Sequence, residues 1–169
     1  AKALCDRDKK LDDSEFRADA SDPGTTVQSV ILGGQAPDER FEQWVARLHI
    51  QHILQRGLRF ISTGEMRKTL LIRAIMDAPA LLILDSPLDG LDLASQQDMR
   101  KIIDELLHSD MLVLMLCRQL EDVPAGISHV MVLNEGGIVA SGSQPCVSAI
   151  PDVIALMNPP MPGLGELPT

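Results

Sequence analysis

The side chains best suited to chemistry lie in two short stretches, residues 62–65 and residues 85–92. The first, Ser-Thr-Gly-Glu, has the pattern of a capping box, with Ser62 at the N-cap of a helix and Glu65 at its third position. A helix start also presents free N–H groups and a positive dipole end, and Ser62 and Gly64 leave room for a phosphate. Because Glu65 adds a negative charge, such a site suits a phosphate that carries a metal ion or other cations.

Asp85 is the last residue of the aliphatic run ALLILD, at the carboxyl end of a predicted strand. Ligands of open α/β sheets bind at this end of the strands, and a carboxylate there can hold a magnesium ion, directly or through water. A strand-terminal aspartate can equally cap the turn that follows it. The order of the two stretches, a small-residue helix start and then an aliphatic strand ending in aspartate, favours the metal site.

The elements that must position these residues follow from apolar spacing. Helices are predicted over residues 37–55, from Ser62 to Pro79, and from Asp92 or Ser95 to Leu106, and Thr25 or Thr26 is expected to cap a short helix before them. The runs ALLILD and MLVLMLC predict buried strands, and HVMVLNEGGIVASG predicts a hairpin with an Asn-Glu-Gly-Gly turn. The helix after Ser62 is expected to expose three cationic side chains: Arg67, Lys68 and Arg73.

Composition narrows the class of protein. Of the 169 residues, 45% are hydrophobic but only 2% are aromatic, which predicts one domain with an aliphatic core. The net charge of −9 disfavours direct binding of nucleic acid. Three widely spaced cysteines predict neither a disulfide framework nor a zinc site and favour a reducing cytosol. No apolar run reaches the roughly 18 residues of a membrane span, so a membrane would be reached only through a partner.

Strand, helix and strand at this spacing predict right-handed βαβ units and an α/β fold. The string of motifs from about residue 25 to about residue 150 resembles the nucleotide-binding domain of ABC-type ATPases. Within that family, FISTGEMRKTLL and LDGLDLASQQ are similar to the first half of the cytosolic tandem ATP-binding proteins of the molybdate-transport and photorepair type. This resemblance implies a helical subdomain and the second half of a P-loop NTPase-type parallel sheet, with a C-terminal β-hairpin.

Composition and the resemblance together lead us to expect four parts in the chain. Residues 1–24 are a polar lead-in, and residues 25–78 are the helical subdomain, which ends in the signature helix. Residues 79–145 are the partial ATP-binding core, with the Walker B strand, D-loop, switch region and hairpin. Residues 146–169 are a C-terminal helix and linker tail, rich in proline and glycine.

Roles for single residues come from the resemblance alone. Ser62, Thr63, Gly64 and Glu65 would form the signature motif, which acts in trans on the γ-phosphate held by a partner domain. Asp85 would end the Walker B strand and help to hold magnesium, if a P-loop is supplied. The D-loop, which would line the dimer seam, would contain Asp89, Gly90, Leu91 and Asp92.

Three departures from the family pattern weaken the expected chemistry. A P-loop needs Gly-Lys-Ser or Gly-Lys-Thr, and the 169 residues contain no Gly-Lys pair. Ser86 stands where the family has a glutamate as general base, and a serine hydroxyl does not accept a proton at neutral pH without help. Arg118 stands at the switch histidine; it can pair with phosphate or with a neighbouring carboxylate, but it cannot act as a base.

We therefore expect a fragment or truncated product of an ATP-binding, transport-associated ABC protein, inactive as a hydrolase by itself. The intact protein would use Mg-ATP, whereas this chain alone would bind none, and it would pair with a second copy or with another ABC half. The alternative is a non-catalytic, self-associating interaction module derived from an ABC ATPase, because a partial domain exposes strand edges and apolar surface. Either protein is expected in the cytoplasm, or at the inner face of a membrane through its partner.

Overall fold

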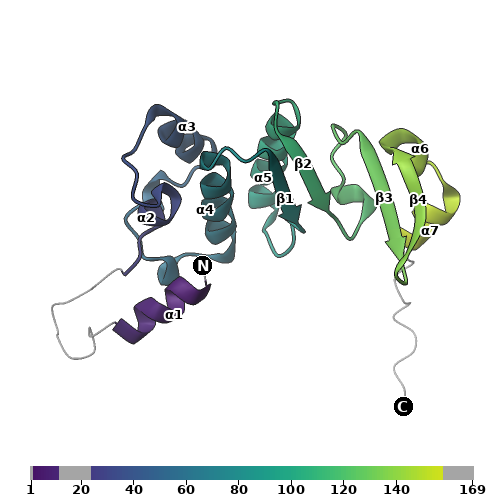
Figure 1. Cartoon of the computed structure of the whole chain (residues 1–169). Coiled ribbons are helices and arrows are strands. Elements are labelled where there is room, and N and C mark those ends of the chain that lie inside the picture. The colour runs from purple at the N-terminus through teal and green to yellow at the C-terminus, as the bar shows by residue number, and fades with distance from the viewer. Residues whose placement is uncertain (1, 12–23, 158–169) are drawn as a thin grey trace, which may run out of the picture. The chain divides into compact units, whose positions relative to one another are not determined.

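A computed structural model describes residues 2–11 and 24–157 of the chain (Figure 1). The chain divides into two compact units, residues 1–114 and residues 115–169, and each is described by itself. Residues 12–23 of the expected lead-in and residues 158–169 of the expected tail lie outside the described residues.

The first unit begins with helices. Helix α1 spans Lys2–Leu11, α2 spans Val27–Leu32, α3 spans Glu39–Arg47 and α4 spans Thr63–Met76. Helix α2 is capped by Thr26, whose side chain accepts a hydrogen bond from the Ser29 amide, and it ends at Gly33 with a left-handed φ of 58°. Thr26 is one of the two caps predicted from the sequence.

The long helix predicted over residues 37–55 is wrong in its second half. Helix α3 ends at Arg47, and His49 has a positive φ of 56°, which no α-helix contains. The chain then forms two short 3-10 turns, η2 (Gln51–Ile53) and η3 (Leu58–Phe60). The turn lets Leu48, Ile50 and Ile53 all become buried, so packing outweighs the apolar spacing that suggested one straight helix.

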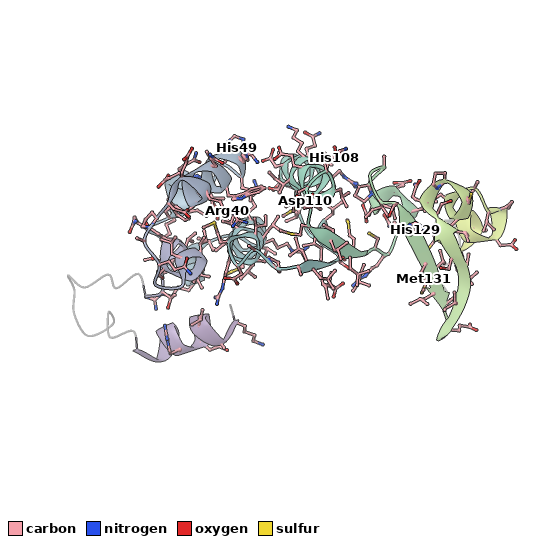
Figure 2. The ribbon with its side chains drawn as sticks, turned by 45° about the horizontal axis from the view of Figure 1, so that its top comes forward. Arg40, His49, His108, Asp110, His129 and Met131 are labelled. Carbon is pink, nitrogen blue, oxygen red and sulfur yellow. The ribbon has the colours of Figure 1, made fainter. Side chains whose placement is uncertain are left out.

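Helix α4 packs against α2 and α3 in an aliphatic core. The buried side chains of these elements include Val27, Phe41, Val45, Ile72 and Ile75, each no more than 1% exposed. Arg40 of α3, labelled in Figure 2, donates a 2.7 Å hydrogen bond to the carbonyl of Ile75 at the end of α4. This contact satisfies a carbonyl in the last turn of α4 and ties that turn to α3.

A strand, a helix and a strand follow α4 in the order expected for a βαβ unit. Strand β1 spans Leu81–Asp85, α5 spans Leu93–Leu107 and β2 spans Leu112–Leu116, and the two strands pair in one sheet. Their arrows point the same way in Figure 1, which is the parallel arrangement that a helical crossover produces. Helix α5 contributes Met99, Ile102, Ile103 and Leu106 to the core.

The second unit is a hairpin packed on two helices. Strands β3 (His129–Asn134) and β4 (Gly137–Ser143) are antiparallel, after a short 3-10 turn η4 (Leu120–Asp122). Glu135 and Gly136 form the turn with φ values of 49° and 79°, as a two-residue type I′ loop requires. Val132 packs on Val147 and Val153 of α6 (Gln144–Ser148) and α7 (Pro151–Met157).

The chain thus has the α/β fold class predicted from its sequence, with a helical part, a small parallel sheet and a C-terminal hairpin. None of the described helices is both long and apolar enough to cross a membrane.

Candidate functional site

The first turn of α4 is a complete capping box. The Glu65 amide donates a 3.2 Å hydrogen bond to the Ser62 hydroxyl, and the Ser62 amide donates a 2.7 Å bond to the Glu65 carboxylate. Ser62 and Thr63 are exposed, so the helix start faces solvent. The capping interpretation of this motif is therefore correct as structure, and it leaves the start of α4 accessible to a ligand.

The carboxylate of Glu65 is held in its charged form. The Ser62 amide that donates to it is the main reason why the pKa of Glu65 lies below its usual range, while partial burial acts in the opposite direction. Nε2 of His52 lies 3.4 Å from the same carboxylate. Glu65 thus brings a negative charge to the helix start, so an anion bound there needs a cation with it.

The carboxyl end of β1 carries a strained turn. Asp85 is exposed, and the Ser86 hydroxyl donates a 3.1 Å hydrogen bond to its carboxylate. Ser86 itself has a φ of 45°, a left-handed conformation that costs a side-chain-bearing residue about 1–2 kcal/mol. Two donors meet its carbonyl oxygen: the Asp89 amide at 3.2 Å and the guanidinium of Arg67 at 2.8 Å.

The loop between β1 and α5 is anchored by its leucines and by α5. Leu88 and Leu91 are buried, at 3% and 8% exposure. The side-chain amide of Gln96 donates to the carbonyls of both residues, at 3.4 Å and 3.1 Å. Gly90 has a φ of 67° and open space around it, so the tip of the loop is unobstructed.

Asp92 ends this loop as the N-cap of α5. Its carboxylate accepts a 2.9 Å hydrogen bond from the Ser95 amide, which lowers the pKa of Asp92, and another from the Ser95 hydroxyl. Of the two helix starts predicted from the sequence, Asp92 rather than Ser95 is the cap.

The fold brings the two polar stretches together. A Cβ atom added at Gly64 would lie 3.5 Å from the Leu91 side chain and 3.5 Å from the Ser95 hydroxyl. The start of α4 therefore lies against the end of the β1–α5 loop. This contact between motifs far apart in the sequence is the central feature of the candidate site.

The expectation that Lys68 is exposed is wrong. Lys68 is 8% exposed, and its ammonium group lies 3.1 Å from the carboxylate of Asp98 on α5. Arg67 is also half-buried, whereas Arg73 is exposed as predicted. Lys68 lies four and seven residues before Ile72 and Ile75, and this spacing on the buried face was the signal that sequence reasoning missed.

A cavity of about 300 Å³ lies beside the candidate site, between α4 and β1. Most of its lining is aliphatic, from Leu70, Leu71, Ala74, Leu82, Ile83, Leu84, Pro87 and Met99. Arg67 and Asp85 are the two charged residues of the lining. The same cavity is thus lined by Arg67 of α4 and by Asp85 at the end of β1.

The residues around Asp85 are compatible with a magnesium ion that carries phosphate. Among the described residues, no three His, Cys, Asp or Glu side chains come together to hold a metal. Magnesium does not require such a cage, since it is commonly held by one or two carboxylates, water and substrate phosphates. Asp85, exposed and with Ser86 beside it, can supply one such carboxylate.

Arg118 lies in the second unit, just after β2, and its side chain is exposed. The start of α4, Asp85 and the β1–α5 loop all belong to the first unit. The role of Arg118 at the switch position therefore stays a prediction.

Comparison with known proteins assigns this arrangement to a family. A match to the ABC transporter family covers residues 9–89, which contain the start of α4, Asp85 and Ser86. The chain contains part of an ABC transporter ATP-binding domain. The ABC match ends within the β1–α5 loop.

Two curated ABC relatives extend the similarity. The ABC transporter ATP-binding protein ModF of Escherichia coli K12 is 32% identical over 123 residues, which cover 73% of this chain and 25% of ModF. The zinc import ATP-binding protein ZnuC of Sodalis glossinidius is 40% identical over 115 residues, which cover 68% of this chain and 45% of ZnuC. The chain thus spans between a quarter and half of the length of these two relatives.

Solved ABC structures support the fold. The ATP-binding cassette MJ1267, in its ADP conformation, superposes with a TM-score of 0.63 at 22% identity, over 78% of this chain and 62% of that structure. A nucleotide-free ATP-binding cassette gives a TM-score of 0.62, also at 22% identity. These likenesses show that the α/β fold is that of ABC cassettes.

Proposed function

We propose that this chain supplies part of a Mg-ATP site in an ABC ATPase associated with transport. The observation that carries the proposal is the closeness of Gly64 to Leu91 and Ser95, because the start of α4 then lies beside the loop that follows Asp85. By resemblance to the ABC family, these stretches would be the signature motif and the D-loop. Two motifs that face one nucleotide interface in that family would then lie side by side.

Ser62, Thr63, Gly64 and Glu65 would contact the γ-phosphate of an ATP molecule held by a partner domain. The exposed start of α4 offers N–H groups and its positive dipole end for this contact. The charge of Glu65 is balanced when the phosphate arrives with magnesium.

Asp85 would serve the other nucleotide, as a magnesium ligand in the site of its own chain. Because the 169 residues hold no Gly-Lys pair, the phosphate loop of that site would come from outside them. Bound magnesium would neutralise phosphate charge, and Asp85 would orient it, with Asp89, Gly90, Leu91 and Asp92 along the seam between domains.

Hydrolysis at this site would be slow or absent. Ser86 has no basic group, and its hydroxyl donates to Asp85 instead of accepting a proton from water. Arg118, at the position of the switch histidine, would stabilise phosphate charge without removing a proton. We propose that the domain binds nucleotide and reports its presence rather than turning it over.

The partners follow from the family. The domain would pair with a second copy or another ABC half, in the cytoplasm or at the inner face of a membrane, and would reach a membrane only through that partner. The net charge of −9 supports a role without direct contact to nucleic acid.

Calorimetric titration with Mg-ATP tests the proposal. The chain alone is expected to show no binding tighter than about 1 mM, which corresponds to about −4 kcal/mol. A chimera that places the phosphate-loop segment of an ABC relative before residue 1 is expected to bind Mg-ATP. In the chimera, Asp85→Asn is expected to weaken Mg-ATP binding about tenfold, since one charged ligand is lost.

Asp110→Asn is the matched control, because it removes an equally exposed carboxylate from the same unit (Figure 2). Circular dichroism confirms that each chimera is folded. If the folded chimera binds Mg-ATP equally well with and without Asp85→Asn, the proposed magnesium role is contradicted.

A second candidate, a self-associating module without nucleotide chemistry, is favoured by exposed aliphatic side chains on the strands. Leu81 and Ile83 of β1 and Leu112 and Leu114 of β2 are between 47% and 68% exposed. They alternate with better buried residues, so each strand turns one apolar side to solvent. Such side chains are commonly covered by another chain.

A further inference from the structure

The carbonyl of Ser86 accepts hydrogen bonds from both α4 and the β1–α5 loop. Nη1 of Arg67, on α4, donates to it over 2.8 Å, and the Asp89 amide, in the β1–α5 loop, donates to it over 3.2 Å. The bond from Arg67 is partly buried, and a partly buried bond to a charged donor is stronger than an exposed neutral one. The loop is therefore tied to α4 through this oxygen.

These hydrogen bonds matter because the backbone of Ser86 has a left-handed conformation. A residue with a side chain keeps a φ of 45° only where the surroundings over-determine it. The residue also orients Asp85, since its hydroxyl donates to the Asp85 carboxylate. A change in the backbone of Ser86 would thus move the carboxylate proposed to hold magnesium.

The other end of the tie is the start of α4. Arg67 lies two residues after Glu65, near the capping box of Ser62 and Glu65. Lys68, the next residue, fixes the same turn to α5 through Asp98. A movement of the first turn of α4 would therefore move Arg67, and with it the hydrogen bond to the Ser86 carbonyl.

We propose that Arg67 is a positioning residue, which holds the Asp85–Ser86 turn in its strained form and couples it to the start of α4. Because the start of α4 would serve the partner's nucleotide and Asp85 the chain's own, Arg67 would link the two nucleotide sites. The functional part of this inference rests on the proposed function, whereas the structural tie does not.

Amide hydrogen exchange of the full chain, measured by NMR without nucleotide, tests the tie. Arg67→Met keeps much of the apolar stem and removes the donor, so the Asp89 amide, which shares the Ser86 carbonyl, is expected to exchange about tenfold faster. Amides inside α5 and in the hairpin are expected to stay within about twofold of the unchanged chain. Arg67→Lys retains one donor and is expected to restore part of the protection.

Arg73→Met is the matched control, because it makes the same change at an exposed position of the same helix. Ser86→Gly is the second test, since glycine adopts a positive φ without the penalty of a Cβ atom. In that background, Arg67→Met is expected to change the Asp89 exchange rate by less than about threefold. If Arg67→Met does not fold, Arg67→Lys replaces it. The Asp89 exchange rate of Arg67→Lys is then compared with and without Ser86→Gly.

Three outcomes would overturn the inference: an unchanged Asp89 rate in Arg67→Met, a uniform rise in exchange over the whole unit, or an equal rise in the Ser86→Gly background. Each would mean that Arg67 does not hold the turn. None of them bears on the Mg-ATP titration, so failure of the tie and failure of the proposed function are separately visible.

Discussion

The three cationic residues on α4 show how strongly one helix can vary the environment of similar side chains. Arg67 is half-buried on a backbone carbonyl, Lys68 is buried against Asp98, and Arg73 is exposed. Their spacing from the apolar residues Ile72 and Ile75 decides which of them turns inward. Whether a cationic side chain of α4 is buried therefore depends on its position around the helix rather than on its residue type.

The pair of Lys68 and Asp98 is expected to respond unequally to removal of its two members. Asp98→Ala leaves a buried ammonium group unpaired and should lower the free energy of unfolding by about 2–3 kcal/mol. Lys68→Met replaces the buried cation by an apolar chain of similar length and should cost less than about 1 kcal/mol. Urea unfolding of both variants measures the difference, and equal losses would contradict the burial of Lys68.

Glu65 is expected to make the stability of the first unit sensitive to acid. The pKa of Glu65 is lowered in the folded chain, mainly by the Ser62 amide, so its contribution is complete above the unfolded pKa. That contribution is lost as the pH falls below about 4.5 and through the lower pKa of the folded chain. Glu65→Gln should reduce this acid-induced loss, by less than about 1 kcal/mol.

Urea midpoints at about pH 6 and about pH 3 test the role of Glu65, with Glu42→Gln on α3 as the control at an exposed position. If the Glu65→Gln variant loses as much stability on acidification as the unchanged chain, Glu65 does not cause the sensitivity to acid.

At the scale of elements, side-chain caps decide where the helices begin. Thr26, Asp38, Ser62 and Asp92 each accept a hydrogen bond from a backbone amide in the first turn of the following helix. The cap at Ser62 has a second effect, since the same turn lies against Leu91 and Ser95. The start of α4 is thus fixed both by its own hydrogen bonds and by the neighbouring loop.

Ser62→Ala removes the oxygen that accepts the Glu65 amide and is expected to cost about 1 kcal/mol of stability. Thr63→Ala, one position further on and equally exposed, is expected to cost less than about 0.5 kcal/mol because Thr63 is not the cap. Urea unfolding followed by circular dichroism compares the two variants. Equal losses would mean that the capping box contributes little to α4.

At the scale of the whole molecule, the exposed aliphatic strand residues argue for a partner. Leu81 and Ile83 lie on β1, which ends at Asp85, and Leu112 and Leu114 lie on β2, which pairs with it. A second set of apolar side chains is exposed on the hairpin of the other unit: Met131, which Figure 2 labels, Leu133 and Ile138. Both proposed functions therefore predict association, with a second copy or with another ABC half.

Light scattering during size-exclusion chromatography is expected to show self-association at concentrations of tens of micromolar, an order-of-magnitude range for modest interfaces. Leu112→Lys, on β2, should shift the chain toward the monomer, because it buries a charge in the apolar contact. Leu93→Lys is the control, since Leu93 is 78% exposed but lies on the first turn of α5. A monomeric chain, or equal effects of the two variants, would contradict association through the strands.

The sequence by itself determined the elements that depend on local chemistry. The capping box at Ser62 and the hairpin turn at Glu135 follow from residues that are close in the chain, so their patterns predict them directly. The aliphatic runs likewise predicted β1 and β2, and with them the α/β fold class. The prediction that both strands are buried was wrong, because alternate residues of each strand are exposed. Family resemblance added the expected roles of Asp85 and Ser86, which the titration and exchange experiments address.

Only the tertiary structure decided the contacts between distant segments. Four features each depend on how separate helices and loops pack: the turn at His49, the burial of Lys68, the bond from Arg67 to Ser86 and the closeness of Gly64 to Leu91. Apolar spacing predicts which side of a helix turns inward, but it does not predict which loop that helix meets. The candidate site forms where segments that are distant in the sequence pack against one another. Its parts could therefore be predicted from the sequence, but its assembly could not.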